Sequence, residues 1–262
     1  MKRLVCASAV GRAFSAAAGG LADLLMPAVC VACGCHDAAA EGLCPACGVR
    51  LLRLVSLPYC PRCGATLGPH IPERPDGCGG CPVTLPRFER VIRLGPYADP
   101  LRPLIRGLKY HRCQMTQRLG VMLAEGVAAR LAGRKLDLVM PVPMHWRRRL
   151  ARGRDHARLV AREIARRLDL PLGSELVRVR HTPAQAFLSR TQRIRNVHRA
   201  FGLTGTRAVA GADVLLVDDV TTTGATANEA ARTLLAGGAG HVTLAVIAKA
   251  EAPTAYAEHG WS

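Results

Sequence analysis

Two adjacent carboxylates followed by hydroxyl-bearing residues form the segment of this chain best suited to chemistry. Asp218 and Asp219 follow the apolar run 214–217, and residues 222–226 come directly afterwards. Carboxylates accept hydrogen bonds from the vicinal hydroxyls of a sugar, whereas hydroxyls and N–H groups at the start of a helix bind phosphate. We therefore predict a sugar-phosphate site in which Asp218 and Asp219 are the catalytic pair. The predicted phosphate-binding residues are Thr222, Thr223, Gly224, Ala225 and Thr226.

Other nucleotide-binding loops do not explain this segment. It has neither the Gly-x-x-x-x-Gly-Lys-Ser/Thr spacing of a Walker loop nor the Gly-x-Gly-x-x-Gly spacing of a dinucleotide loop. An ordinary strand, turn and helix with a threonine-rich cap is the plain structural alternative. That alternative is disfavoured, because two acidic residues at the end of an apolar strand are poorly explained by packing.

Eight of the eleven cysteines form four Cys-x-x-Cys pairs. Such pairs are typical of zinc thiolate sites in a reducing compartment, and two Cys₄ sites use all eight ligands. The pairs are Cys30/Cys33, Cys44/Cys47, Cys60/Cys63 and Cys78/Cys81. The simplest arrangement joins the first pair with the second and the third with the fourth, and an interleaved arrangement is also possible. A disulfide cluster is less favoured, because the chain has no convincing export signal.

The zinc sites are predicted to be structural, since a closed Cys₄ shell leaves no position for substrate or water. We expect Cys60→Ser to destabilise the module without altering ligand affinity at a distant pocket. Glycines follow three of the pairs, at Gly34, Gly48 and Gly64, where a tight turn favours positive φ.

Three cysteines remain, Cys6, Cys35 and Cys113, and we expect them to be small apolar fillers or exposed thiols. Cys35 could compete with Cys33 as a ligand, but only Cys33 keeps the Cys-x-x-Cys-Gly spacing.

The chain is strongly basic, with a formal net charge of +17 over 262 residues. Residues 145–199 contain 15 arginines, no lysine and four acidic residues. This excess predicts polyanionic partners such as nucleic acid or phosphorylated small molecules. A solvated surface explains any single arginine, whereas anion binding better explains the cluster. Aromatic residues, at 4%, are too few for a stacking platform along a single nucleic-acid strand.

The hydrophobic pattern of the second part of the chain predicts alternating strands and helices. Buried strands are predicted at 136–140, 214–217 and 242–247, and helices at 157–168 and 226–236. This repetition implies an α/β fold with a mostly parallel sheet covered on both faces. The apolar run near the N-terminus is interrupted by Arg12, well short of a membrane span. We therefore expect a soluble, cytoplasmic protein with no transmembrane segment.

The segment 214–226 resembles the signature of type I phosphoribosyltransferases that binds 5-phosphoribosyl 1-diphosphate (PRPP). The wider chain, over about residues 22–250, resembles the ComF/GntX family, in which a double zinc ribbon precedes such a domain. The resemblance includes Leu104 to Tyr110, Val142-Pro143, Arg178 to Thr182, Gln185, Leu188-Ser189, Arg193, Asn196 and Ala200-Phe201. One departure is Arg152-Gly153-Arg154-Asp155-His156, where family members often carry Arg-Gly-Phe-Asn-Gln. It puts in doubt any function assigned to that Asn or Gln.

The resemblance implies a type I phosphoribosyltransferase-like fold that binds PRPP with Mg²⁺ and transfers phosphoribosyl to an unidentified acceptor. It also implies that residues after the strand 136–140 help to hold pyrophosphate, which makes Arg147 and Arg148 candidates. Residues near 181–199 correspond to a flexible hood over the site. The alternative is a non-catalytic competence or DNA-uptake factor that binds single-stranded DNA. A zinc-ribbon adaptor with a mere scaffold domain is disfavoured by the intact acidic pair.

These patterns divide the chain into four expected parts. They are an N-terminal helical segment (1–29), a double zinc ribbon (30–84), a phosphoribosyltransferase-type domain (85–250) and a C-terminal tail (251–262).

Overall fold

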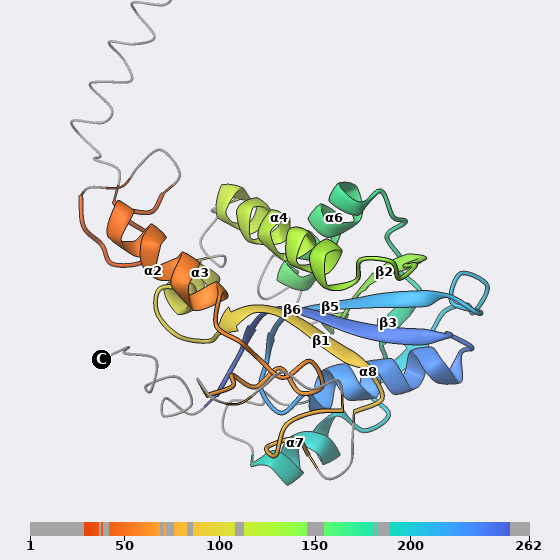
Figure 1. The fold of residues 1–262 in the computed structure, drawn as a ribbon. Helices are drawn as coiled ribbons and strands as arrows, with labels where there is room; N and C mark the ends of the chain where they lie inside the picture. The colour runs from red at the N-terminus through yellow and green to blue at the C-terminus, as the bar shows by residue number, and fades with distance from the viewer. Residues whose placement is uncertain are drawn as a thin grey trace, which may run out of the picture.

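A four-stranded parallel sheet forms the centre of the molecule (Figure 1). The computed structural model describes residues 29–36, 38, 42–68, 71, 76–82, 86–107, 113–145, 155–180, 182 and 189–251. The strands are β1 (Arg90–Pro96), β2 (Leu138–Pro141), β5 (Asp213–Thr221) and β6 (His241–Lys249), in the order β1-β6-β5-β2. This arrangement confirms the predicted α/β class with a mostly parallel sheet.

Strand β5 extends farther than its apolar run. The side chains from Val214 to Val217 are buried, as predicted. Pairing with β6 then continues to Thr221, which lies opposite Lys249. Asp218 pairs with Val246 and Val220 pairs with Ala248, so Asp218 and Asp219 lie inside the strand rather than in a turn after it.

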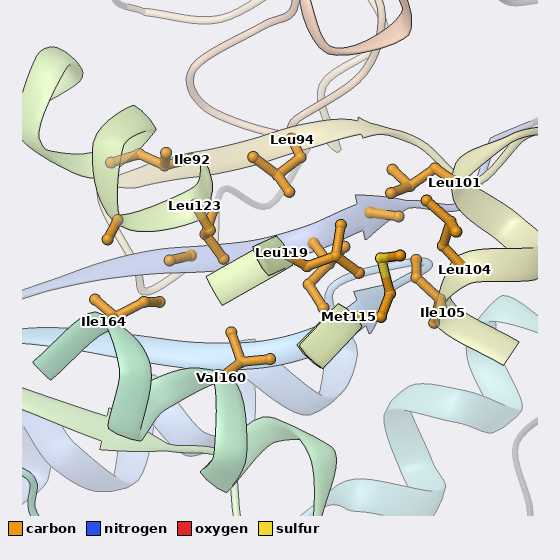
Figure 2. Close-up of a cluster of buried hydrophobic side chains, with 14 of the residues drawn as sticks. Ile92, Leu94, Leu101, Leu104, Ile105, Met115, Leu119, Leu123, Val160 and Ile164 are labelled. Atoms are coloured by element: carbon orange, nitrogen blue, oxygen red, sulfur yellow. The ribbon is translucent and has the colours of Figure 1, made fainter. Parts of the chain in front are cut away.

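Helices cover both faces of the sheet. Helices α4 (Cys113–Arg130) and α6 (His156–Leu168) lie over one face and α8 (Ala225–Ala236) over the other (Figure 1). Side chains alternate along β5, so Leu215 and Val217 join the core under α4 and α6, whereas Val214 and Leu216 join the core under α8. Figure 2 shows the first core, where side chains of α3 (Leu101–Gly107), α4 and α6 meet those of β1. Among the described residues, no helix is long and apolar enough to cross a membrane.

The sequence of α6 explains both its start and its orientation. Asp155 caps the helix, because its carboxylate accepts a hydrogen bond from the N–H of Arg158 at 3.1 Å. Val160 and Ile164 are fully buried, whereas Arg162 is exposed. The helix predicted at 157–168 therefore docks on the core with a basic outer side, and its N-terminus lies beside the carboxyl ends of the strands.

A small arm stands apart from the main sheet. Strands β3 (Leu176–Arg178) and β4 (Phe201–Leu203) pair in antiparallel fashion, and α7 (Arg190–Val197) lies between them in sequence. We call the described residues from 176 to 203 the β3–β4 arm. A capping box starts α7: Ser189 Oγ accepts from the N–H of Gln192 at 3.3 Å, and Gln192 Oε1 accepts from the N–H of Ser189 at 2.8 Å.

The cysteine-rich part docks on β1 in two places. Helix α2 (Pro45–Val55) buries Leu51 and Leu54 in the core that contains Ile92 and Leu94 of β1. The second contact is polar and involves Arg93, whose side chain is fully buried.

Arg93 forms an ion pair with Glu251, and both residues also hydrogen-bond to Thr66 of the cysteine-rich part. Its Nη1 lies 3.0 Å from Glu251 Oε1, and its Nη2 donates to Thr66 Oγ1 at 2.7 Å. Glu251 also accepts from the N–H of Thr66 at 2.8 Å and from its hydroxyl at 2.7 Å. The guanidinium carbons of Arg93 and Arg130 lie 5.0 Å and 4.2 Å from the centre of the Tyr59 ring. This network joins residues 59–66 to the sheet.

Candidate functional site

A cavity of about 330 Å³ opens at the carboxyl edge of the parallel sheet. Ligands of open α/β sheets bind at this edge, because loops from neighbouring strands diverge there. The lining comes from five places: the segment after β2, the start of α6, the β3–β4 arm, the end of β5 and the start of α8. The residues are Val142, Pro143, Met144, Asp155, His156, Ala157, Arg178, Arg193, Asp218, Asp219, Val220, Thr221, Thr222, Gly224, Ala225 and Thr226.

The two predicted catalytic carboxylates both line this cavity. Asp218 Oδ1 accepts a hydrogen bond from the N–H of Asp219 at 2.9 Å, and Asp219 Oδ1 accepts from the N–H of Val220 at 2.7 Å. These bonds orient the two carboxylates. Burial of the carboxyl raises the pKa of Asp218 well above its ordinary value, and the negative charges of Asp219 and Asp155 add to the effect. Such a concentration of carboxylates is suited to sugar hydroxyls and divalent cations.

The loop after β5 presents a helix N-terminus to the same cavity. Gly224 occupies the N-cap position of α8 with φ of +76°, a conformation that disfavours residues with a side chain. The N-cap glycine has no side chain, and Thr223 Oγ1 accepts from the first helical N–H, that of Ala225, at 3.4 Å. Ala225 and Thr226 line the cavity at the positive end of the helix dipole. Lys249 Nζ donates to the carbonyl of Thr222 and fixes the loop from behind.

Four of the five predicted phosphate-binding residues line the cavity, and Thr223 does not. Thr223 lines a second cavity of about 170 Å³ behind the loop, with its hydroxyl 3.4 Å from the N–H of Ala225. The remaining predicted residues, Arg147 and Arg148, lie outside the described residues.

Sequence reasoning gave no role to four polar residues of the cavity. Asp155 and His156 stand where family members often carry Asn and Gln, and both line the cavity beside the acidic pair. Arg178 and Arg193 come from the β3–β4 arm, so guanidinium groups meet carboxylates in one cavity. Arg178 is supported by the buried Thr182 hydroxyl, to which its Nη2 donates at 2.5 Å. The family resemblance includes both arginines but gives neither a role; Arg193 lies in the segment that corresponds to the hood, and Arg178 precedes that segment.

The eight paired cysteines gather into two clusters, one from the first two pairs and one from the last two. Within each cluster all four sulfur atoms lie within 4.8 Å of one another. A tetrahedral zinc thiolate site with Zn–S bonds of about 2.3 Å has sulfur–sulfur edges of about 3.8 Å. The distances fit, at 3.8 Å for Cys33–Cys44, 3.6 Å for Cys60–Cys81 and 3.7 Å for Cys63–Cys78. The sequential pairing is therefore confirmed, and the interleaved alternative is wrong.

Backbone hydrogen bonds influence the ionisation of Cys30, the first ligand of the first cluster. Burial opposes ionisation of Cys30, but N–H donors of Cys44, Cys33 and Ala32 outweigh it and lower its pKa to about 6. Thiolates are the zinc ligands, so these hydrogen bonds favour the metal-bound form of Cys30, whereas burial raises the pKa of Cys47 and of Cys63. Cys35 stays outside the cluster and lies within hydrogen-bond reach of Cys44.

The expected glycine turns occur in two of three places. Gly34 and Gly64 have φ of +79° and +75°, and each donates its N–H to the carbonyl of the first cysteine of its pair. Gly48 does not form such a turn, because Cys44 caps α2 and the second pair lies in the helix.

The second cysteine cluster is close to the predicted phosphate loop, contrary to the expected separation. The 170 Å³ cavity behind the loop is lined by Cys63 and Gly80 on one side and by Thr222, Thr223 and Gly224 on the other. The sequence suggested separation because about 140 residues divide the two motifs. In the fold, the cysteine-rich part docks on β1, and β1 pairs with β6. Lys249 at the end of β6 lines the same cavity as the second cysteine cluster and the phosphate loop.

Comparisons with known proteins agree with this architecture. Residues 155–261 match the phosphoribosyl transferase domain model, and residues 21–82 match the double zinc ribbon domain model. The chain is thus a protein with a phosphoribosyltransferase-type domain behind a double zinc ribbon. DNA utilization protein YhgH of Escherichia coli K12 is 36% identical over 226 residues, covering 84% of this chain and 96% of that protein. Competence protein F of Haemophilus influenzae is 34% identical over 212 residues, covering 78% and 90%. This chain belongs to the ComF/GntX family.

Solved structures overlap less with the chain. A glutamine PRPP amidotransferase from B. subtilis complexed with ADP and GMP is 23% identical, with a TM-score of 0.35, and covers 50% of this chain and 25% of that one. TT1426 from Thermus thermophilus is 21% identical, with a TM-score of 0.33, and covers 55% and 78%. The family assignment rests on the sequence relatives and the domain models instead.

Proposed function

We propose that this protein binds PRPP with Mg²⁺ in the 330 Å³ cavity and transfers phosphoribosyl to an acceptor. The observation that carries the proposal is the meeting of Asp218 and Asp219 with the N-terminus of α8 in one cavity. The two features suit the two ends of a ribose 5-phosphate. Carboxylates accept from its hydroxyls, and the helix N–H groups and Thr226 hydroxyl donate to its phosphate.

The chemistry needs no covalent nucleophile on the protein. The bond between ribose C1 and the diphosphate oxygen breaks, and its electron pair leaves with the diphosphate. An acceptor nitrogen or oxygen then bonds to C1 and loses a proton. Positive charge develops on the ribose ring during this exchange, and in this proposal the carboxylates of Asp218 and Asp219, which line the cavity, stabilise it.

The donor set of the cavity fits a hard divalent cation. Mg²⁺ prefers carboxylate and phosphate oxygens and retains several waters. Asp218, Asp219 and Asp155 supply carboxylates in one cavity, and their mutual repulsion is relieved by a cation. When bound, Mg²⁺ supplies positive charge to the diphosphate.

Isothermal titration calorimetry with Mg²⁺ and PRPP tests binding. Asp218→Asn with Asp219→Asn should abolish it while leaving the fold intact. Asp213→Asn is the matched control, because Asp213 lies at the opposite end of the same strand and outside this cavity. Unchanged PRPP affinity in the double variant refutes the site. Turnover of labelled PRPP against pooled bases, nucleosides and oligonucleotides tests transfer and identifies the acceptor.

A second candidate function is binding of single-stranded DNA, as a competence or DNA-uptake factor. The printed names of the relatives, DNA utilization protein and Competence protein F, favour it. So does the arginine excess of residues 145–199, part of which reaches the cavity through Arg178 and Arg193. Fluorescence anisotropy with a labelled oligonucleotide tests this role, and no binding even at low salt refutes it.

We also propose that each cysteine cluster holds one structural Zn²⁺ in a reducing, cytoplasmic compartment. Four thiolates close each shell, so the metal stabilises the ribbon and takes no part in transfer.

A further inference from the structure

Positive charge on the β3–β4 arm is not balanced by acidic residues of the same segment. Between Glu175 and Asp213 the sequence has seven arginines and neither aspartate nor glutamate. Arg180, Arg195 and Arg199 are exposed, and their side chains form no ion pair within the described part of the chain. These guanidinium groups are therefore available to an external anion.

The nearest acidic residue of the neighbouring helix is already neutralised. Glu229 of α8 accepts from the backbone N–H of Arg199 at 2.7 Å, and its carboxylate pairs with Arg232 at 2.7 Å. Burial opposes ionisation of Glu229, but these hydrogen bonds outweigh it and lower the pKa of its carboxyl. Glu229 thus fixes the backbone at Arg199 but leaves the guanidinium of Arg199 unbalanced.

The basic face of α6 differs in this respect. Arg166 pairs with Glu163 at 2.6 Å, and Arg167 pairs with Glu125 at 3.3 Å. Acidic neighbours therefore offset part of the charge on α6, whereas Arg180, Arg195 and Arg199 have no ion pair with any described residue. Of the two basic surfaces, the arm has the greater net attraction for a polyanion.

The exposed arginines of the arm meet at one end of α7. Arg195 lies in the last turn, Arg199 follows the helix, and Arg180 Nη1 donates to the carbonyl of His198 at 2.5 Å. The N–H of Val179 donates to the carbonyl of Ala200 at 2.9 Å, which holds the two segments together.

This charged end is continuous with the cavity. Arg178, the last residue of β3, lines the cavity, and Arg180 follows it two residues later in the chain. Two exposed apolar side chains lie on the arm as well, Val179 at 59% and Ile194 at 54% exposure. An unpaired nucleic-acid strand presents both phosphates and apolar base faces, which match this mixture of side chains.

We propose that the β3–β4 arm is the track for single-stranded nucleic acid, running from the C-terminal end of α7 to the mouth of the PRPP cavity. The inference rests on the proposed DNA-binding function and adds which surface performs it. Arginines without interleaved aromatic residues contact phosphates and discriminate little between bases. Binding is therefore weakly sequence-dependent and strongly salt-dependent.

Anisotropy titrations of a labelled single-stranded oligonucleotide over a series of salt concentrations test the track. The arm variant combines Arg180→Gln, Arg195→Gln and Arg199→Gln, and the matched control combines Arg158→Gln, Arg162→Gln and Arg166→Gln on α6. Each removes three charges. Each lost phosphate contact lowers the slope of log affinity against log salt by about 0.7, so the arm variant should lose about 2 of slope. The control should keep its slope.

Equal losses of slope in both variants would mean that only net charge matters. A larger loss of slope in the α6 variant would mean that the nucleic acid binds on α6. Either result overturns the inference. A double variant, Arg195→Gln with Arg199→Gln, retains the Arg180 contact to α7 and should lose about two thirds of the effect. The arm variant should bind Mg²⁺ and PRPP normally, because its three residues do not line the cavity. That result also shows that it is folded.

Competition separates this inference from the functions on which it rests. Saturating Mg²⁺ and PRPP should weaken oligonucleotide binding to the unmodified protein, because Arg178 and Arg193 border both ligands. Fully independent binding refutes a track that reaches the cavity. No oligonucleotide binding by the unmodified protein refutes the DNA function itself. The Asp218→Asn, Asp219→Asn variant should lose PRPP binding and keep DNA binding. That result supports both the PRPP site and the nucleic-acid track.

Discussion

Replacing Asp218 by Asn is expected to stabilise the free protein while it abolishes PRPP binding. Burial and the charges of Asp219 and Asp155 raise the pKa of Asp218 in the folded state. Asn keeps an oxygen that can accept the 2.9 Å hydrogen bond from the N–H of Asp219. The substitution therefore removes the cost of a buried charge without removing its hydrogen bond.

The sign and size of this effect follow from proton linkage. The unfolded carboxyl ionises near its ordinary pKa of about 3.9, and the folded one ionises only at higher pH. Over that interval the folded state binds more protons, so the stability of the unmodified protein falls as pH rises through it. Each unit of pKa elevation costs about 1.4 kcal/mol at neutral pH, or about 3–5 °C in Tm for a domain of this size. The gain in Asp218→Asn should vanish at acid pH, where both side chains are neutral.

Thermal unfolding monitored between about pH 4 and about pH 8 measures this difference. Asp213→Asn, at the far end of β5, should neither abolish PRPP binding nor reproduce the pH-dependent gain in Tm. A lower Tm for Asp218→Asn at neutral pH, or a gain that is the same at every pH, would refute the reasoning.

Three further predictions concern the metal clusters and the contact between the cysteine-rich part and the sheet. Elemental analysis should find two zinc ions per chain, one for each cluster; a zinc-free protein with disulfides would contradict the assignment. Cys63→Ser should weaken PRPP binding in calorimetry, because Cys63 lines the cavity behind the phosphate loop. Cys33→Ser in the other cluster should not weaken it, and equal affinities of the two variants would show that the second cluster does not influence the loop. Glu251→Ala should destabilise the protein by about 3–5 kcal/mol in urea unfolding, because it leaves the buried guanidinium of Arg93 without its carboxylate. Adding Arg93→Met should recover much of that loss, and no recovery would show that packing rather than charge explains it.

Local patterns predicted most of the central sheet and the acidic pair. The run from Val214 to Val217 is buried in a parallel strand, and Asp218 and Asp219 lie where its carboxyl end meets a helix. Cysteine spacing likewise predicted two clusters with sequential pairing. These features succeed because the signal and the structure both lie within a few neighbouring residues.

Local sequence patterns could not predict contacts between segments that are distant in the chain. Strands β3 and β4 have three residues each, too few for a period, and they acquire their partners only through the folding of the arm. Arg178 is one arginine among many until β3 places it in the cavity. The approach of Cys63 to Thr223 depends on docking against β1 and β6, which no local spacing encodes.

The link between Thr66 and Glu251 has a consequence for how the chain is made. The two residues are 185 positions apart, so the cysteine-rich part leaves the ribosome long before its carboxylate partner does. Chains are synthesised at about 5–20 residues per second and N-terminal domains generally fold first. During that interval the cysteine-rich part depends on its metal sites for stability, because Glu251 is not yet present to bind Thr66. Strand β1 also lacks its hydrogen-bonding partner until β6 has been synthesised. Zinc supply during translation, rather than after it, should then decide how much of the newly made protein reaches the assembled state.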